Sequence, residues 1–181
     1  MERNVVMIAL FAALIAALGL IPKITLISGV PISAQSLGVM LCGTVLGARR
    51  GALAAALFVL LVALGLPLLA GGRGGLGVFA GPTTGFVLGF PIAAYATGFI
   101  VEKWRDGALL WVSMVAAVIG GIIVLYIPGI IGMAITLDKP LTVAAGFATP
   151  FIPGDIIKAV LAGLVTSAMA KARPDSVLSR D

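Results

Sequence analysis

The chain has 181 residues, of which 61% are hydrophobic and only 10% are charged. Soluble domains carry about 25% charged residues, so this composition predicts an integral membrane protein and excludes a soluble enzyme, a disulfide-rich secreted scaffold and a disordered tail. The formal net charge is +5, but the basic residues stand in short clusters between apolar runs, which is typical of membrane topology rather than of nucleic-acid binding.

Six apolar segments approach the length of about 20 helical residues that a membrane crossing needs. Charges and Pro/Gly clusters separate them, and they cover approximately residues 5–21, 33–48, 51–69, 83–101, 108–126 and 153–170. The runs are continuous and rich in Ala, Leu and Gly, so they lack the alternation of barrel strands. We predict an all-α integral membrane protein with one domain over residues 1–181, whose first span is an uncleaved helix rather than a signal peptide.

The distribution of Lys and Arg predicts the orientation, because these residues are enriched in cytoplasmic loops. If the N-terminus is cytoplasmic, the inner segments hold Arg3, Arg49, Arg50, Lys103, Arg105, Lys171, Arg173 and Arg180, whereas the outer segments hold Lys23, Arg73 and Lys139. We therefore expect both termini in the cytoplasm. The adjacent Arg49 and Arg50, between the second and third spans, are interpreted as a topology anchor rather than as a catalytic or ligand site.

Two outer segments are unusual. Residues 70–82 place six glycines around Arg73. Their match to G-x-G-x-x-G is not interpreted as a dinucleotide site, because a membrane helix precedes it and Thr97 stands where an acidic residue is needed. Either the segment is a flexible turn, or Arg73, Gly74 and Gly75 approach a small ligand. Residues 127–152 are expected to form a long connection, either an interfacial helix or a lid.

Asp155 and Lys158 carry two charges in the last apolar segment, near its predicted outer end. Their spacing of three puts them on one helix face. Charges inside a membrane are costly and usually face a cavity or a partner. A helix cap with a mutual ion pair is one interpretation, but it does not explain a lysine one turn inside an apolar helix. We favour a role in ligand binding.

Uncharged polar groups are scarce. The side-chain amides are Asn4 and Gln35, and the chain contains no histidine and one cysteine, Cys42, so an ordinary metal site is not expected. Gln35 at the outer end of the second span and Thr83 at the outer end of the fourth join the charged pair on one side of the membrane. This convergence predicts a ligand pocket near the outer face.

Small residues recur at helical spacing in two places. Gly81, Gly85 and Gly89 follow one face of the fourth span, which favours close packing between helices of this chain. Ala9, Ala13 and Ala17 form a similar stripe on the first span, which has no polar side chain between residues 5 and 21. Such a stripe suits close contact either within the chain or with a partner.

Several short motifs, in this order and spacing, resemble the BioY family of biotin-specific substrate-binding (S) components of energy-coupling factor (ECF) transporters. They are VPISAQSLG at 30–38, LGARRG at 46–51, GLP at 65–67, AGGRGG at 70–75, GPT at 81–83 and PGDIIK at 153–158. The family often has Gly-Gly-Tyr after Gly-Pro-Thr, where this chain has Thr84-Gly85-Phe86, so no hydroxyl is expected at Phe86.

The resemblance implies a six-helix protein of a bacterial cytoplasmic membrane that captures biotin, without a cofactor, and assembles with a transmembrane coupling subunit and two ATPases. It implies that the Ala9, Ala13 and Ala17 stripe meets the coupling subunit. Biotin has a carboxylate tail, which suits Lys158 or Arg73, and ureido N–H groups, which suit Asp155 or Gln35. Alternatives are an ion- or proton-coupled carrier that acts alone and, less favoured, a membrane enzyme with Asp155 and Lys158 as acid and base.

Overall fold

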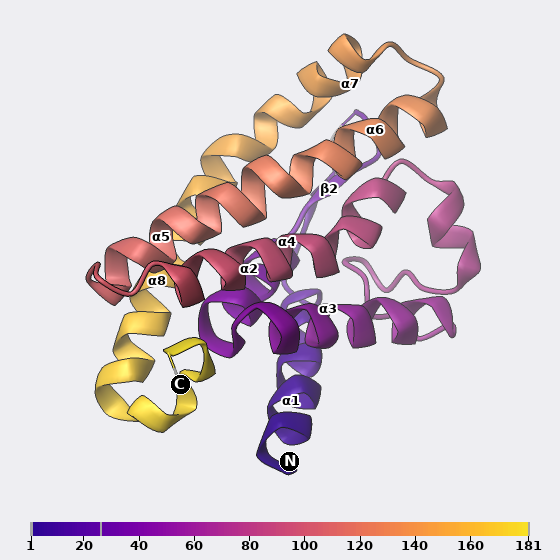
Figure 1. Ribbon diagram of the computed structural model, residues 1–181. Helices are drawn as coiled ribbons and strands as arrows, with labels where there is room; N and C mark the ends of the chain where they lie inside the picture. The colour runs from indigo at the N-terminus through magenta and orange to yellow at the C-terminus, as the bar shows by residue number, and fades with distance from the viewer. Residues whose placement is uncertain (1, 26, 181) are drawn as a thin grey trace.

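The computed structural model describes residues 2–25 and 27–180, and most of that part of the chain is helical (Figure 1). The main helices are α1 (Glu2–Leu18), α2 (Gln35–Leu46), α3 (Ala48–Ala63), α4 (Thr84–Lys103), α5 (Leu109–Val118), α6 (Leu125–Leu137), α7 (Leu141–Ala148) and α8 (Ile152–Ala172). A short antiparallel hairpin, β1 (Ile24–Thr25) and β2 (Pro31–Ile32), joins α1 to α2. A 3-10 turn (Leu76–Ala80) lies between α3 and α4.

Two pairs of helices form longer rods. A π-helical turn (Ile119–Val124) joins α5 to α6, and a 3-10 turn (Thr149–Phe151) joins α7 to α8. With α4, these rods give three helices, Thr84–Lys103, Leu109–Leu137 and Leu141–Ala172, that are long and apolar enough to cross a membrane. This architecture agrees with the predicted all-α class.

The longest departure from the predicted spans is at residues 127–152. The sequence predicts a helix end at 126 and a long connection, but α6 continues through Pro128 to Leu137 and α7 starts at Leu141. The connection between the rods is therefore only residues 138–140, where Asp138 ends α6 in the left-handed conformation. Proline and glycine end helices in water but are tolerated inside membrane helices, because neighbouring groups satisfy the freed backbone atoms.

The third span is also shorter than predicted. It ends at Ala63 rather than near residue 69, and the chain then turns through Leu64 to Pro67. Gly65 has a φ of 106° there, a conformation that favours glycine. The turn directs residues 68–83 across the end of the helix bundle, where they reach the pocket described below.

The core centres on α2, whose residues are almost all buried between α1, α3, α4 and α8. Glycines allow this close approach. A Cβ added at Gly43 would meet Thr97 and the carbonyl of Ala94 on α4, and one added at Gly85 would overlap the carbonyl of Pro128 on α6. Gly89 likewise faces Pro128 and Leu125, so these two glycines of α4 serve packing within the chain. Gly81, predicted on the same face, lies before α4 and makes no such close approach.

Both ends of the described chain lie at one end of the molecule (Figure 1). Arg3 near the start of α1 and Arg173 after α8 line the same hollow. The C-terminal segment, residues 174–180, folds back against the junction of α2 and α3. There the hydroxyl of Ser179 donates to the carbonyl of Thr44 at 2.6 Å, and Arg50 donates to the carbonyl of Leu178 at 3.2 Å. This segment closes the end of the bundle that lies opposite the pocket.

Candidate ligand-binding site

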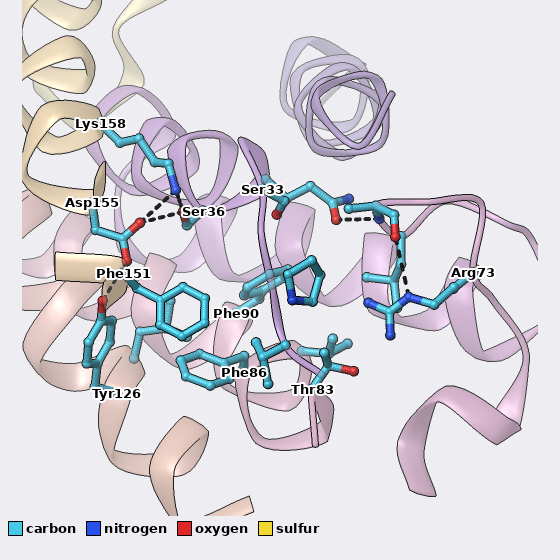
Figure 2. A pocket seen from close by; sticks show the side chains of 17 residues that line it. Ser33, Ser36, Arg73, Thr83, Phe86, Phe90, Tyr126, Phe151, Asp155 and Lys158 are labelled. Atoms are coloured by element: carbon cyan, nitrogen blue, oxygen red, sulfur yellow. Dashed lines mark hydrogen bonds and ion pairs between the residues drawn. The ribbon is translucent and has the colours of Figure 1, made fainter. Parts of the chain in front are cut away.

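A pocket opens at the end of the bundle away from the chain termini. It lies among β2, the loop after α3 and the N-terminal turns of α2, α4, α6 and α8 (Figure 2). Its cavity volume, counted as the space open to the centre of a water molecule, is about 70 Å³. The lining residues are Val30, Pro31, Ser33, Gln35, Ser36, Leu69, Ala70, Arg73, Thr83, Phe86, Val87, Phe90, Leu125, Tyr126, Phe151, Asp155 and Lys158.

A charged network occupies one side of the pocket. The ammonium Nζ of Lys158 lies 2.7 Å from Oδ1 of Asp155, one turn earlier on α8. The hydroxyl of Ser36 on α2 donates to the same oxygen at 3.1 Å and accepts from Lys158 at 3.0 Å. The hydroxyl of Tyr126 on α6 donates to Oδ2 of Asp155 at 2.7 Å. The carboxylate is 7% exposed, so three helices surround a buried ion pair and satisfy both of its carboxylate oxygens.

A second polar group lies across the pocket from this network (Figure 2). Arg73 comes from the loop after α3, and its Nε donates to the carbonyl of Ala70 at 3.3 Å. No carboxylate pairs with Arg73 in the part of the chain that the structure describes. Thr83, at the start of α4, has a buried hydroxyl that finds no hydrogen-bond partner among the described residues. Arg73 and Thr83 therefore offer unused donors to a ligand.

An aromatic wall separates the two polar groups. Phe86 lies edge-on to Tyr126, with ring centroids 5.9 Å apart, and lies 6.1 Å from Phe151. Phe90 lines the same wall, one turn further along α4 (Figure 2). Aromatic side chains give a rigid apolar surface that favours contact with rings and alkyl chains. The pocket thus has a charged pair at one side, a cationic group at the other and apolar walls between them.

Gln35 lines the pocket, but its amide is engaged with the protein itself. Its Nε2 donates to the carbonyls of Ile15 on α1 at 3.2 Å and of Leu68 at 3.0 Å. Its Oε1 accepts from the backbone N–H of Ala70 at 3.0 Å. Both amide protons are thereby used, so Gln35 holds the pocket wall together and has little capacity left for a ligand.

Gly74 and Gly75 lie outside the pocket lining, although the sequence places them among the ligand contacts. A Cβ at Gly74 would overlap the carbonyl of Leu66, so this glycine permits a close approach of two chain segments. The N–H of Gly75 donates to the carbonyl of Val62 at 2.8 Å, at the end of α3. These glycines shape the loop that carries Arg73, which is their observed contribution to the site.

The structure adds site residues that the sequence did not single out. Tyr126 contacts the Asp155 carboxylate, and Ser36 bridges the ion pair. A signal was available for Tyr126, since it is one of two tyrosines in the chain and the polar group nearest the middle of the apolar run 109–137. The phenylalanines gave no such contrast, because an apolar ring in a membrane helix resembles its lipid-facing neighbours.

The alanine stripe of α1 points away from the protein. Ala9, Ala13 and Ala17 are exposed, whereas Phe11 and Ile15 on the opposite face are buried. The stripe therefore does not serve packing within this chain. Its exposed small residues leave room for another helix to approach the α1 backbone.

Long apolar helices around a pocket with charged ends and aromatic walls define a membrane protein that binds a small amphipathic molecule. Comparison with known proteins narrows this class. The model of the BioY family matches residues 2–175, so the chain belongs to the BioY family. The proteins of this family that it resembles are named as transporters, not as enzymes.

The relatives cover nearly the whole chain. A protein from Rhodobacter capsulatus, named biotin transporter BioY, is 52% identical over 99% of this chain and 100% of its own length. A protein of the same name from Rhizobium etli is 51% identical over 95% of each chain. The fold matches the crystal structure of the S-component for biotin from an ECF-type ABC transporter with a TM-score of 0.88, at 29% identity, covering 94% of this chain and 92% of that one.

Proposed function

We propose that this chain captures biotin from outside a bacterial cell and serves in its uptake across the cytoplasmic membrane as the substrate-binding subunit of an ECF-type transporter. The observation that carries the proposal is the order of groups in the pocket: an ion pair, an aromatic wall and an arginine that has no carboxylate partner among the described residues. Biotin has the matching order of a polar ureido group, an apolar bicyclic ring with an alkyl chain, and a carboxylate.

Arg73 is the better partner for the carboxylate tail. Lys158 is already neutralised by Asp155 at 2.7 Å, whereas Arg73 has no carboxylate partner among the described residues. An arginine binds a carboxylate with two parallel hydrogen bonds. The ureido group then lies at the other side, where Asp155 accepts from its N–H groups and Lys158 donates to its carbonyl. Thr83 supplies a further hydroxyl near the tail.

The pocket must expand for biotin to enter. About 70 Å³ of it is open to the centre of a water molecule, which is room for a few waters. Its lining includes Pro31 on β2 and Ala70 in the loop after α3, both on connecting segments rather than on membrane helices. An outward movement of these connections would admit the ligand while the helices keep their packing.

Binding to purified protein in lipid nanodiscs tests the ligand assignment. We expect one biotin per chain by titration calorimetry, without ATP. Biotin methyl ester, which lacks the negative charge, should bind about 10-fold more weakly than biotin, as expected for one lost charge-assisted contact. In Arg73→Gln the two ligands should bind alike. A folded protein that ignores biotin would overturn the proposal, and a preserved preference for the acid in Arg73→Gln would move the tail to Lys158.

The proposed partners are a transmembrane coupling subunit, which meets α1 along Ala9, Ala13 and Ala17, and two ATPase subunits. The exposure of this stripe supports the first contact. Uptake into proteoliposomes separates this proposal from a carrier that acts alone. We expect ATP-dependent biotin accumulation only when the module is included. Accumulation by the chain alone, driven by a proton or ion gradient, would favour the stand-alone carrier.

A further inference from the structure

A second hollow lies on the side of the bundle near the chain termini, between the junction of α2 and α3 and the last turns of α4. By the same measure as above, about 350 Å³ of it is open to the centre of a water molecule. Its lining residues are Leu46, Ala48, Arg49, Arg50, Tyr95, Phe99, Glu102 and Lys103. Nothing in the biotin site extends here, since that pocket lies at the other end of the helices.

The polar end of this hollow is cationic. Arg49 and Lys103 are exposed, and Arg50 is half-buried with one N–H group donated to the carbonyl of Leu178. Glu102 is the acidic residue of the lining, and its Oε1 accepts the backbone N–H of Ala48 at 2.8 Å. Glu102 forms no ion pair with these cations in the described part of the chain. The lining therefore keeps an excess of positive charge that is available to an anion.

The apolar end of the hollow is an aromatic surface. Tyr95 and Phe99 stand one turn apart on the outward face of α4, 46% and 45% exposed. Their rings are stacked with centroids 6.2 Å apart and an interplanar angle of 14°. The Nζ of Lys103, one turn further along, lies 5.8 Å from the centroid of Phe99. A cation, two rings and then the apolar middle of α4 follow one another along the helix.

We propose that this hollow binds one anionic phospholipid, with its phosphate at Arg49, Arg50 and Lys103 and an acyl chain along Phe99 and Tyr95. The charge excess favours an anionic headgroup over a zwitterionic one, whose ammonium the cations would repel. The aromatic surface favours a lipid over a soluble phosphate. It leads from the cationic end of the hollow to the apolar middle of α4, where an acyl chain can lie but a soluble phosphate has nothing to bind. Basic pockets at the ends of membrane helices commonly bind anionic headgroups in this way.

This site gives Arg49 and Arg50 a role beyond setting the topology. The proposed topology puts the site in the inner leaflet. Binding of the lipid depends only on the groups described above, so it can be tested in detergent without knowledge of the orientation. The site is also independent of biotin, which binds at the other end of the helices.

Native mass spectrometry of the purified full-length chain tests the proposal. The delipidated protein is titrated with phosphatidylglycerol or phosphatidylcholine of identical acyl chains. We expect the first phosphatidylglycerol to bind about 10-fold more tightly than phosphatidylcholine. Arg49→Gln/Lys103→Gln should remove this preference, and Tyr95→Ala/Phe99→Ala should weaken both lipids. The control Lys139→Gln/Lys171→Gln loses the same charge at two exposed lysines outside the hollow and should behave like the unchanged protein.

Two results would overturn the proposal. An equal loss of preference in both charge variants would show that total charge, rather than this hollow, attracts the lipid. Competition by soluble glycerol phosphate, with no effect of the aromatic substitutions, would show that the hollow binds a small phosphate anion. Each variant is first checked for an unchanged melting temperature and a single elution peak, so that loss of binding is not confused with misfolding.

Discussion

The ammonium of Lys158 lies 2.7 Å from the carboxylate of Asp155, and this ion pair stands inside a membrane helix with only one turn between its members. Charges in this environment are stable only when each has a partner and the remaining lone pairs are satisfied. Ser36 and Tyr126 complete that requirement from two other helices. The pair is therefore already organised before any ligand arrives.

Lys158→Ala tests the ion pair directly. Removal of one partner of a buried charge pair costs about 2–5 kcal/mol, so biotin affinity should fall by about 30-fold or more. The matched control is Lys171→Ala, an exposed lysine at the other end of α8, which should leave affinity unchanged. Titration calorimetry on both variants gives the comparison. Normal biotin affinity in folded Lys158→Ala and Asp155→Ala proteins would reduce the pair to a helix cap.

Tyr126→Phe removes one hydroxyl and keeps the ring that contacts Phe86. The hydroxyl donates to Asp155 at 2.7 Å, and hydrogen bonds to charged groups contribute about 1.5–3 kcal/mol. We expect biotin affinity to fall about 10-fold, because the carboxylate loses a group that fixes its orientation. Tyr95→Phe, outside the pocket, serves as the control. Equal affinity in the two variants would show that Asp155 is held without Tyr126.

Thr83→Val replaces a buried hydroxyl by a methyl group of the same shape. Since this hydroxyl has no partner among the described residues, the ligand-free protein should melt at the same or a higher temperature. Biotin affinity should fall about 5-fold, as expected for one neutral hydrogen bond. Thr97→Val removes another buried hydroxyl, which also lacks a partner in the described part of the chain and does not line the pocket, so it should change stability alone. A Thr83 variant with unchanged affinity would remove the residue from the site.

Ala13→Trp places a bulky ring at the centre of the exposed α1 stripe. Helix association in membranes depends on how closely the backbones approach, so assembly with the coupling subunit and energised uptake should weaken. Biotin affinity should stay near that of the unchanged protein. Ala168→Trp, at an exposed alanine of α8, is the matched control. Reduced biotin binding with normal pull-down of the coupling subunit would assign the stripe to this chain's own stability.

The topology prediction is testable with reporter fusions. The Lys and Arg distribution predicts cytoplasmic signals for fusions at Arg50, Asp106 and the C-terminus, and outside signals near Gly75 and Lys139. The structure adds that Arg50 and the C-terminal segment contact each other, so they must report the same side. An outward C-terminus would reverse the orientation and place the proposed biotin pocket on the cytoplasmic side.

Much of this structure is predictable from sequence, because charge and polarity stand out against an apolar background. Asp155 and Lys158 are the clearest case, since a charged side chain inside a membrane segment is costly and usually has a functional role. The prediction of a long connection at residues 127–152 was wrong, because Pro128 and its neighbouring glycine do not end a helix in a membrane as they do in water. Phe86 and Phe151 carry no contrast in an apolar helix, and only the fold shows that they meet.

Gln35 illustrates a different limit. A lone buried amide is equally suited to a ligand and to backbone groups, and the sequence cannot show which acceptors stand nearby. In the structure, the carbonyls of Ile15 and Leu68 take both of its protons. The residue type was informative, but its role depended on segments that are distant in the chain.

The placement of this amide has a mechanical consequence. Through Gln35, α1 is joined to Leu68 and Ala70, a few residues before Arg73 on the same loop. If a partner shifts α1 along its exposed alanine face, the loop must either follow the helix or lose the hydrogen bonds of a buried amide. A single side chain thus links the α1 surface to the loop that carries Arg73, so Gln35→Leu should uncouple partner docking from ligand binding and also loosen the pocket wall beside Ala70.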